Sequence, residues 1–124
     1  RLGCGDRLVG RSHECDWPIA VLDLPCISRP RIDVDASSVD IDSQVREHSL
    51  NGEPVYKLDD AVLASLAPDL IIAQDHCRVC AVTKADVESS LSCANVAQLV
   101  LKPSTLHDCM RDVGLIADAL GVSA

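Results

Sequence analysis

The segment Asp69-Leu70-Ile71-Ile72-Ala73-Gln74 is the feature that most limits how this chain can fold. Its apolar run is unbroken and follows Pro68, so no polar residue marks a side that faces water. A strand of this kind is normally buried on both faces, as in a parallel sheet covered by helices. The sequence therefore predicts that Leu70 to Ala73 is a central strand.

Other short runs have strand character and alternate with helical patterns. The predicted strands are residues 7–11, 25–28, 70–74 and 96–101. The predicted helices are a segment capped by Ser37 or Ser38 that ends at Asn51-Gly52, the segment Ala61 to Leu66 capped by Asp59 or Asp60, and the segment Lys84 to Leu91 capped by Thr83.

A last helix follows Pro103, with Ser104 as its predicted cap and Gly121 as its end. Its apolar residues share one face, which we expect to pack on the sheet. They are Leu106, Cys109, Met110, Val113, Ile116, Ala117 and Leu120.

This alternation predicts one α/β domain over residues 1–124, a three-layer sandwich with a mostly parallel sheet and helices on both faces. Ligands of such sheets bind beyond the carboxyl ends of the strands. The loops at that edge are Ser12 to Pro18, Arg29 to Asp33, Gln74 to Val82 and Lys102 to Thr105.

Composition excludes several classes of partner. With 11 Lys and Arg against 19 Asp and Glu, the formal charge of −8 opposes binding to nucleic acid or anionic lipid. Hydrophobic residues make up 48% of the 124 residues, but no run approaches the roughly 18 positions of a membrane span, so we expect no membrane insertion. No signal peptide is visible.

Two of the strand-end loops carry an imidazole and thiols, His13-Glu14-Cys15-Asp16-Trp17-Pro18 and Gln74-Asp75-His76-Cys77-Arg78-Val79-Cys80. If both open on one edge, His13, Cys15, Cys77 and Cys80 supply four soft ligands of the kind that tetrahedral zinc prefers. A lone C-x-x-C is weak support for such a site. Two alternatives remain: a redox dithiol, or cysteines that pack or form a local disulfide while His13 and Trp17 anchor a loop.

Catalytic signatures are missing, so we expect a protein that is not an enzyme. The sequence has no G-x-S-x-G, no glycine-rich phosphate loop and no H-E-x-x-H. Gly3-x-Gly5 precedes the first predicted strand and so does not read as a dinucleotide fingerprint. Seven cysteines are an odd number, which leaves at least one thiol free or paired between chains.

The same residues resemble the cobalamin-type and iron-chelate-type solute-binding proteins of bacterial ABC importers. The matching words are Gly5-Asp6-Arg7-Leu8-Val9-Gly10, His13 to Pro18, Ser28 to Asp33, Ile41-Asp42, Gln44-Val45, Tyr56-x-Leu58-Asp59, Leu66-x-Pro68-Asp69-Leu70-Ile71-Ile72, and Gln74-Asp75-x-Cys77-x-Val79-Cys80-Ala81-Val82. The resemblance covers nearly the whole chain.

What the resemblance implies is the first, Rossmann-like lobe of a two-lobed, periplasmic or cell-surface binding protein. A cobalamin-like or metal-chelate ligand would lie at the strand-end loops, and the partner would be an importer permease. The family's opening strand and second lobe are not matched by this chain, so we expect exposed apolar surface and a homo-oligomer.

The leading hypothesis is thus a binding module for a small molecule, with His13, Cys15, Asp16 and Trp17 on one side of a shallow site. Gln74, Asp75, Cys77 and Cys80 would form the other side. Trp17, the one tryptophan, can lie flat against a planar ligand. The alternative is a small metal-binding or thiol-active protein that uses the His-x-Cys and C-x-x-C loops.

Overall fold

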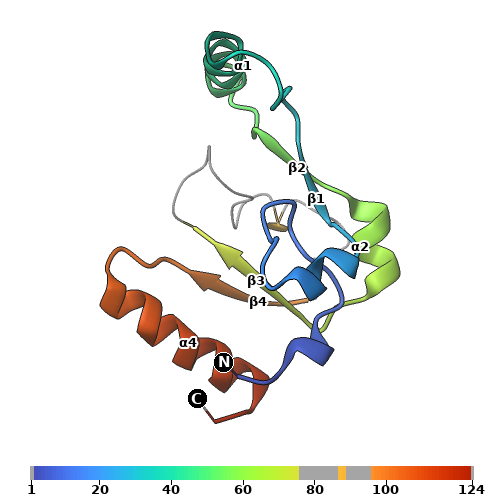
Figure 1. Ribbon diagram of the computed structural model, residues 1–124, viewed down its shortest axis with the longest axis vertical. Coiled ribbons are helices and arrows are strands. Elements are labelled where there is room, and N and C mark those ends of the chain that lie inside the picture. The colour runs from blue at the N-terminus through green and yellow to red at the C-terminus, as the bar shows by residue number, and fades with distance from the viewer. Residues whose placement is uncertain (1, 76–86, 89–95, 124) are drawn as a thin grey trace.

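The computed structural model describes residues 2–75, 87–88 and 96–123. In chain order the elements are the 3-10 helices η1 (Gly5–Arg7) and η2 (Ile19–Asp23), then β1 (Ser28–Pro30), α1 (Ser38–Leu50), β2 (Tyr56–Leu58), α2 (Asp60–Leu66), β3 (Leu70–Gln74), β4 (Ala97–Leu101) and α4 (Leu106–Leu120) (Figure 1). The predicted helix Lys84 to Leu91 lies largely outside the described residues.

The strands form two small sheets. Strand β1 pairs with β2 in antiparallel fashion, and β3 pairs with β4 in parallel. Helices together with these sheets give an α/β architecture. Within the described residues β3 has β4 on one side alone, and Ile72 on β3 is 43% exposed. The central position that we predicted for this strand, buried on both faces, is therefore not found there.

The prediction for the first part of the chain is wrong. Residues 7–11 form no strand: Arg7 ends η1, and Arg11 makes one isolated parallel bridge with Cys26. The predicted strand at 25–28 is displaced to Ser28–Pro30, where its partner is the unpredicted strand β2. A three-residue strand has too few side chains to show a hydrophobic period, so the sequence alone does not reveal it.

Helix α1 and the strands that lead to it project from the body of the molecule (Figure 1). Its cap is as predicted: the Ser37 Oγ accepts the Asp40 N–H at 3.3 Å, and Asn51 and Gly52 follow the helix. The helix contains no buried residue. The buried residue of this region, Val55, lies outside the helix, just before β2. Since α2 and α4 each contain a buried residue, α1 is the least enclosed of the described α-helices.

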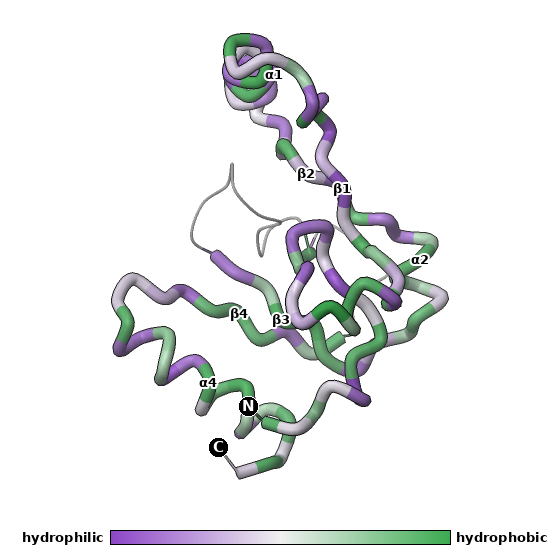
Figure 2. The backbone as a smooth tube through the Cα atoms, in the orientation of Figure 1, coloured by the Kyte–Doolittle hydropathy of each residue, from purple (hydrophilic) through white to green (hydrophobic). Residues whose placement is uncertain are grey.

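The core lies where α2 meets β3. Leu63 of α2 and Ile71 of β3 are buried together with Val87. Ile27, Leu58, Ala73 and Val96 pack around them. Figure 2 shows hydrophobic residues along β3 and β4, in contrast to the mixed pattern of α1. Helix α2 begins as predicted, since the Asp59 side chain accepts the Val62 N–H at 3.2 Å.

Helix α4 departs from the prediction in two ways. Its cap is Thr105, one residue after Ser104, and Thr105 forms a capping box with Asp108. Its apolar face is only partly covered: Ala117 is buried, but Leu106 is 80% and Met110 67% exposed. Asp112, which is not part of the predicted apolar face, is buried as well, with 5% of the residue exposed.

No α-helix in the described part of the chain combines the length and the apolar character that crossing a bilayer requires.

Candidate functional site

The loop of residues 12–18, called here the His13 loop, is held at its base by backbone contacts. The Arg11 N–H donates to the Pro25 carbonyl at 3.0 Å, and the Arg11 carbonyl accepts the Ile27 N–H at 2.8 Å. Just before it, Gly10 runs against α2, because a Cβ there would stand 2.9 Å from the Leu66 Cδ1 and 3.1 Å from the Ile27 Cγ2. The base of the loop is thus fixed by residues far along the chain.

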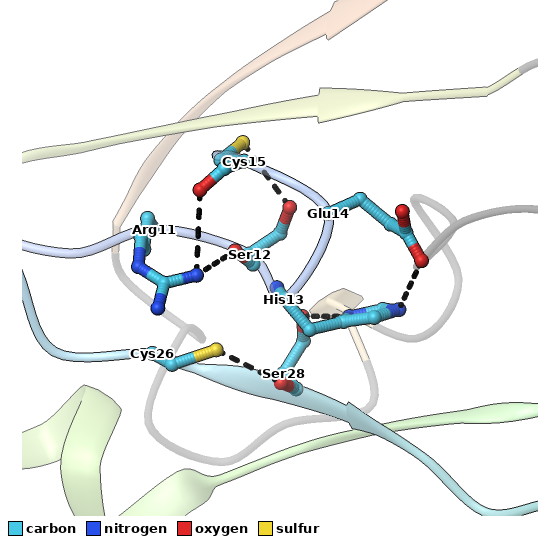
Figure 3. A network of polar contacts seen from close by, with 7 residues as sticks. All are labelled: Arg11, Ser12, His13, Glu14, Cys15, Cys26 and Ser28. Carbon is cyan, nitrogen blue, oxygen red and sulfur yellow. Dashed lines mark hydrogen bonds and ion pairs between the residues drawn. The ribbon is translucent and has the colours of Figure 1, made fainter. Parts of the chain in front are cut away.

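The Arg11 side chain closes the turn of this loop (Figure 3). Its Nη1 donates to the carbonyl oxygens of Ser12 at 3.2 Å and Cys15 at 3.3 Å. The Cys15 N–H donates to the Ser12 carbonyl at 3.2 Å. The guanidinium gives the turn charge-assisted hydrogen bonds, which are stronger than neutral ones.

Ser28, at the start of β1, holds the loop from the other side. Its side chain is buried, with 4% of the residue exposed. Its Oγ accepts the His13 backbone N–H at 3.1 Å and lies 2.7 Å from the His13 Nδ1 (Figure 3). One hydroxyl therefore fixes both the backbone and the ring of the same histidine.

Both ring nitrogens of His13 have a polar neighbour. Its Nε2 lies 3.4 Å from the Glu14 Oε1. Its Nδ1 lies 2.7 Å from the Ser28 Oγ, and which of these two atoms donates depends on the tautomer of the ring. The ring also packs on Tyr56 of β2, with centroids 4.7 Å apart. A metal can reach this imidazole only if Ser28 or Glu14 moves away.

The outer part of the loop faces solvent. Cys15, Asp16 and Trp17 are all exposed, Trp17 by 78%. The Cys15 Sγ lies 3.2 Å from the Ser12 Oγ, and the thiol is free. Ile19, at the start of η2, is 71% exposed. The loop therefore presents a thiol, a carboxylate and an indole on a fixed base.

The second predicted group lies at the carboxyl end of β3, as expected for Gln74 and Asp75. Asp75 extends the parallel pairing, since its N–H donates to the Leu101 carbonyl at 2.9 Å. Its carboxylate accepts a hydrogen bond from the Lys102 Nζ at 3.2 Å. In the described part of the chain no hydrogen bond or ion pair joins Gln74 or Asp75 to the His13 loop.

The predicted metal site falls partly outside what the structure describes, because Cys77 and Cys80 belong to residues 76–86. Among the described residues no group of three or more His, Cys, Asp or Glu side chains is placed to hold a metal ion. Cys4, Cys15, Cys26 and Cys109 are free thiols there. The four-ligand cluster with His13 and Cys15 stays a prediction.

Sequence reasoning missed three residues that shape the loop: Arg11, Ser28 and Tyr56. Arg11 falls inside a predicted strand and Ser28 at the end of another, and neither position signals a contact with the loop. Tyr56 offered one signal, since it is the chain's one tyrosine and aromatic residues make up 2% of the sequence. Its contact with His13 joins residues too distant in sequence for spacing to reveal.

Comparisons with protein-family models, with curated proteins and with solved structures found no match for this chain.

Proposed function

We propose that this chain is a non-enzymatic binding module for a small planar ligand of the corrinoid or metal-chelate class, held against Trp17 of the His13 loop. The observation that carries the proposal is the exposure of Trp17, 78% on a loop whose base is fixed. Tryptophan is normally highly buried. An indole kept in water on a rigid support buries much area at little entropic cost when a flat ligand covers it.

The contact between Ser28 and His13 supports a binding role for this site and not a catalytic one. The Ser28 Oγ lies 2.7 Å from the His13 Nδ1, which is within reach for a nucleophile and its base. Ser28 is buried, however, and its Oγ already accepts the His13 N–H. Such an oxygen cannot meet a substrate carbonyl unless the loop opens, so the contact serves to hold the loop.

The finer architecture belongs to the same proposal: a three-layer sandwich around a mostly parallel sheet, as in one lobe of a solute-binding protein. It is supported by the parallel β3–β4 pair, by the packing of Leu63 on Ile71, and by the contact between α4 and β4. A periplasmic or cell-surface location and delivery to an importer permease follow from the resemblance alone.

The test is a titration of the whole chain with cyanocobalamin. Because Trp17 is the one tryptophan, its fluorescence reports on this loop, with N-acetyltryptophanamide as the correction for absorption by the corrinoid. Calorimetry measures affinity independently of the indole. Trp17→Ala should weaken binding by about tenfold or more, equivalent to about 1.4 kcal/mol.

Leu50→Ala is the matched control, since Leu50 is 87% exposed but ends α1, which projects from the body of the molecule (Figure 1). Its affinity should equal that of the unchanged chain. Binding that Trp17→Ala leaves intact, or no binding at a corrinoid concentration of about 1 mM, the weakest specific range, would refute the proposal.

The exposed, free Cys15 thiol favours a second candidate, a metal-binding or thiol-active protein. Its signature is one equivalent of zinc in the purified chain, measured by native mass spectrometry. The zinc should be lost in Cys15→Ser and in the Cys77→Ser/Cys80→Ser double variant, but retained in Cys109→Ser. Corrinoid binding without zinc leaves the first proposal standing alone.

A further inference from the structure

The turn that follows α1 carries the residue pair Asn51-Gly52. Both residues are exposed, and they follow a helix that contains no buried residue and projects from the body of the molecule (Figure 1). A Cβ at Gly52 would meet no atom within 4 Å. The space beside the Gly52 backbone nitrogen is therefore open, and the neighbouring Asn51 side chain is free to turn towards it.

Two contacts between His48 and Glu53 close this turn. The Glu53 N–H donates to the His48 carbonyl at 2.9 Å, and the His48 Nδ1 lies 3.3 Å from the Glu53 Oε2. Inside the turn the Gly52 N–H donates to the Ser49 carbonyl at 3.2 Å. The Glu53 side chain is 53% exposed, and ion pairs in water contribute little stability. The turn therefore opens at small cost, which frees the Gly52 nitrogen.

We infer that Asn51 is a site of spontaneous modification, where the side-chain amide is converted to aspartate and isoaspartate through a succinimide. In the open turn the Gly52 nitrogen attacks the Asn51 Cγ, a reaction that the proximity of the two groups favours. A bond forms between this nitrogen and Cγ, the bond between Cγ and Nδ2 breaks, and Nδ2 leaves as ammonia with the Gly52 hydrogen. Water then opens the ring at Cγ to give aspartate, or at the backbone carbonyl carbon to give isoaspartate.

Either product changes the end of α1. A carboxylate then stands at the C-terminal end of the helix, where the negative end of the helix dipole disfavours an anion. Isoaspartate also lengthens the main chain by one atom, because the backbone then runs through Cβ and Cγ of residue 51. The contacts between His48 and Glu53 lose their register as a result. This inference goes beyond the proposed ligand binding and does not depend on it.

Ageing of the full chain in mildly alkaline buffer, followed by trypsin digestion and mass spectrometry, tests the inference. Cleavage after Arg46 and Lys57 gives a peptide that contains Asn51, while Asn95 lies in a separate peptide. The Asn51 peptide should gain the mass of an amide-to-acid exchange, with isoaspartate identified by electron-transfer fragmentation. The Asn95 peptide should stay largely unchanged over the same period, because the β-branched Val96 side chain crowds the attacking nitrogen.

Glu53→Ala is the sharper variant, because it removes the side-chain contact that closes the turn. The Asn51 reaction should become about two- to fivefold faster, the range that an exposed ion pair supplies. Asp42→Ala breaks the exposed ion pair of Asp42 with Arg46 elsewhere on α1 and should leave the rate unchanged. An Asn51 peptide that ages no faster than the Asn95 peptide, or that yields no isoaspartate, would overturn the inference. Equal rates in Glu53→Ala and Asp42→Ala would overturn the role of the turn.

Discussion

The first quarter of the chain and its last quarter reach order by different means. Residues 2–27 contain two short 3-10 helices and one isolated bridge, and they are positioned by contacts with β1, α2 and α4. Residues 97–121 form a strand and a helix with a complete cap at each end. The His13 loop therefore owes its shape to distant residues, whereas α4 owes its boundaries to its own sequence.

The largest effect should come from the close contact at Gly10. Gly10→Ala places a methyl group 2.9 Å from the Leu66 Cδ1 and against the branched Ile27 side chain. Overpacking of this kind costs about 1–3 kcal/mol. We expect the free energy of unfolding, measured by urea denaturation with circular dichroism, to fall by that amount.

Gly5→Ala is the control for Gly10→Ala, since a Cβ at Gly5 meets nothing within 4 Å. It should be neutral or stabilising by up to about 1 kcal/mol, through the entropy of the unfolded chain. Equal effects at both glycines would show that the N-terminal quarter does not depend on its contact with α2.

Ser28→Ala tests the hydrogen bonds that hold the His13 loop. It leaves the His13 N–H and Nδ1 without the Ser28 oxygen, and a buried polar group without a partner costs about 1–3 kcal/mol. Chemical-shift changes in an amide NMR spectrum should spread over residues 12–18. Ser104→Ala, at an exposed serine, should stay within about 0.5 kcal/mol. A change confined to β1 would contradict the role that we give Ser28.

Thr105→Ala tests the local control of α4. It removes the oxygen that accepts the Asp108 N–H at 3.1 Å, and loss of such a cap costs typically about 1 kcal/mol. Thr105→Ser keeps a hydroxyl and should restore most of that stability. The effect should be seen in hydrogen exchange of the first turn of α4, with the His13 loop unaffected. Exchange that also rises in the loop would break the contrast between the two regions.

Only the parts of the fold that depend on neighbouring residues could be predicted from the sequence. Ser37, Asp59 and Gly121 mark helix ends, and these ends could be predicted because a capping residue interacts with backbone only a few positions away. Strand β3 was found at Leu70–Gln74 because its apolar run is continuous. The pairing of β1 with β2 and the contact of Ser28 with His13 join residues 15 or more positions apart. No local pattern encodes those contacts.

The smallest effect should be a dependence on pH at the start of α4. The Ser104 N–H, followed by the Thr105 hydroxyl, holds the pKa of Asp108 below its usual value of 3.8. A carboxyl with a lowered pKa in the folded state stabilises that state above its unfolded pKa, and this stabilisation is lost as the pH falls through the folded pKa. Helicity of the unchanged chain should therefore decline below about pH 4.

Asp108→Asn is the matched variant for this titration, because it keeps the shape but removes the charge. Its acid unfolding, followed by circular dichroism, should begin from lower stability at neutral pH and show a shallower decline. Identical acid curves would mean that Asp108 does not contribute to the acid sensitivity of the helix.

One hydrogen bond connects the two regions that this comparison separates. The Arg7 Nη1 donates to the Leu120 carbonyl at 2.7 Å, across 113 positions of the chain. A contact between residues so far apart needs the closure of a long loop. The Arg7 side chain can therefore be fixed only once α4 is in place, whereas the contacts of Gly10 with Leu66 and of His13 with Ser28 join residues much closer together in the chain.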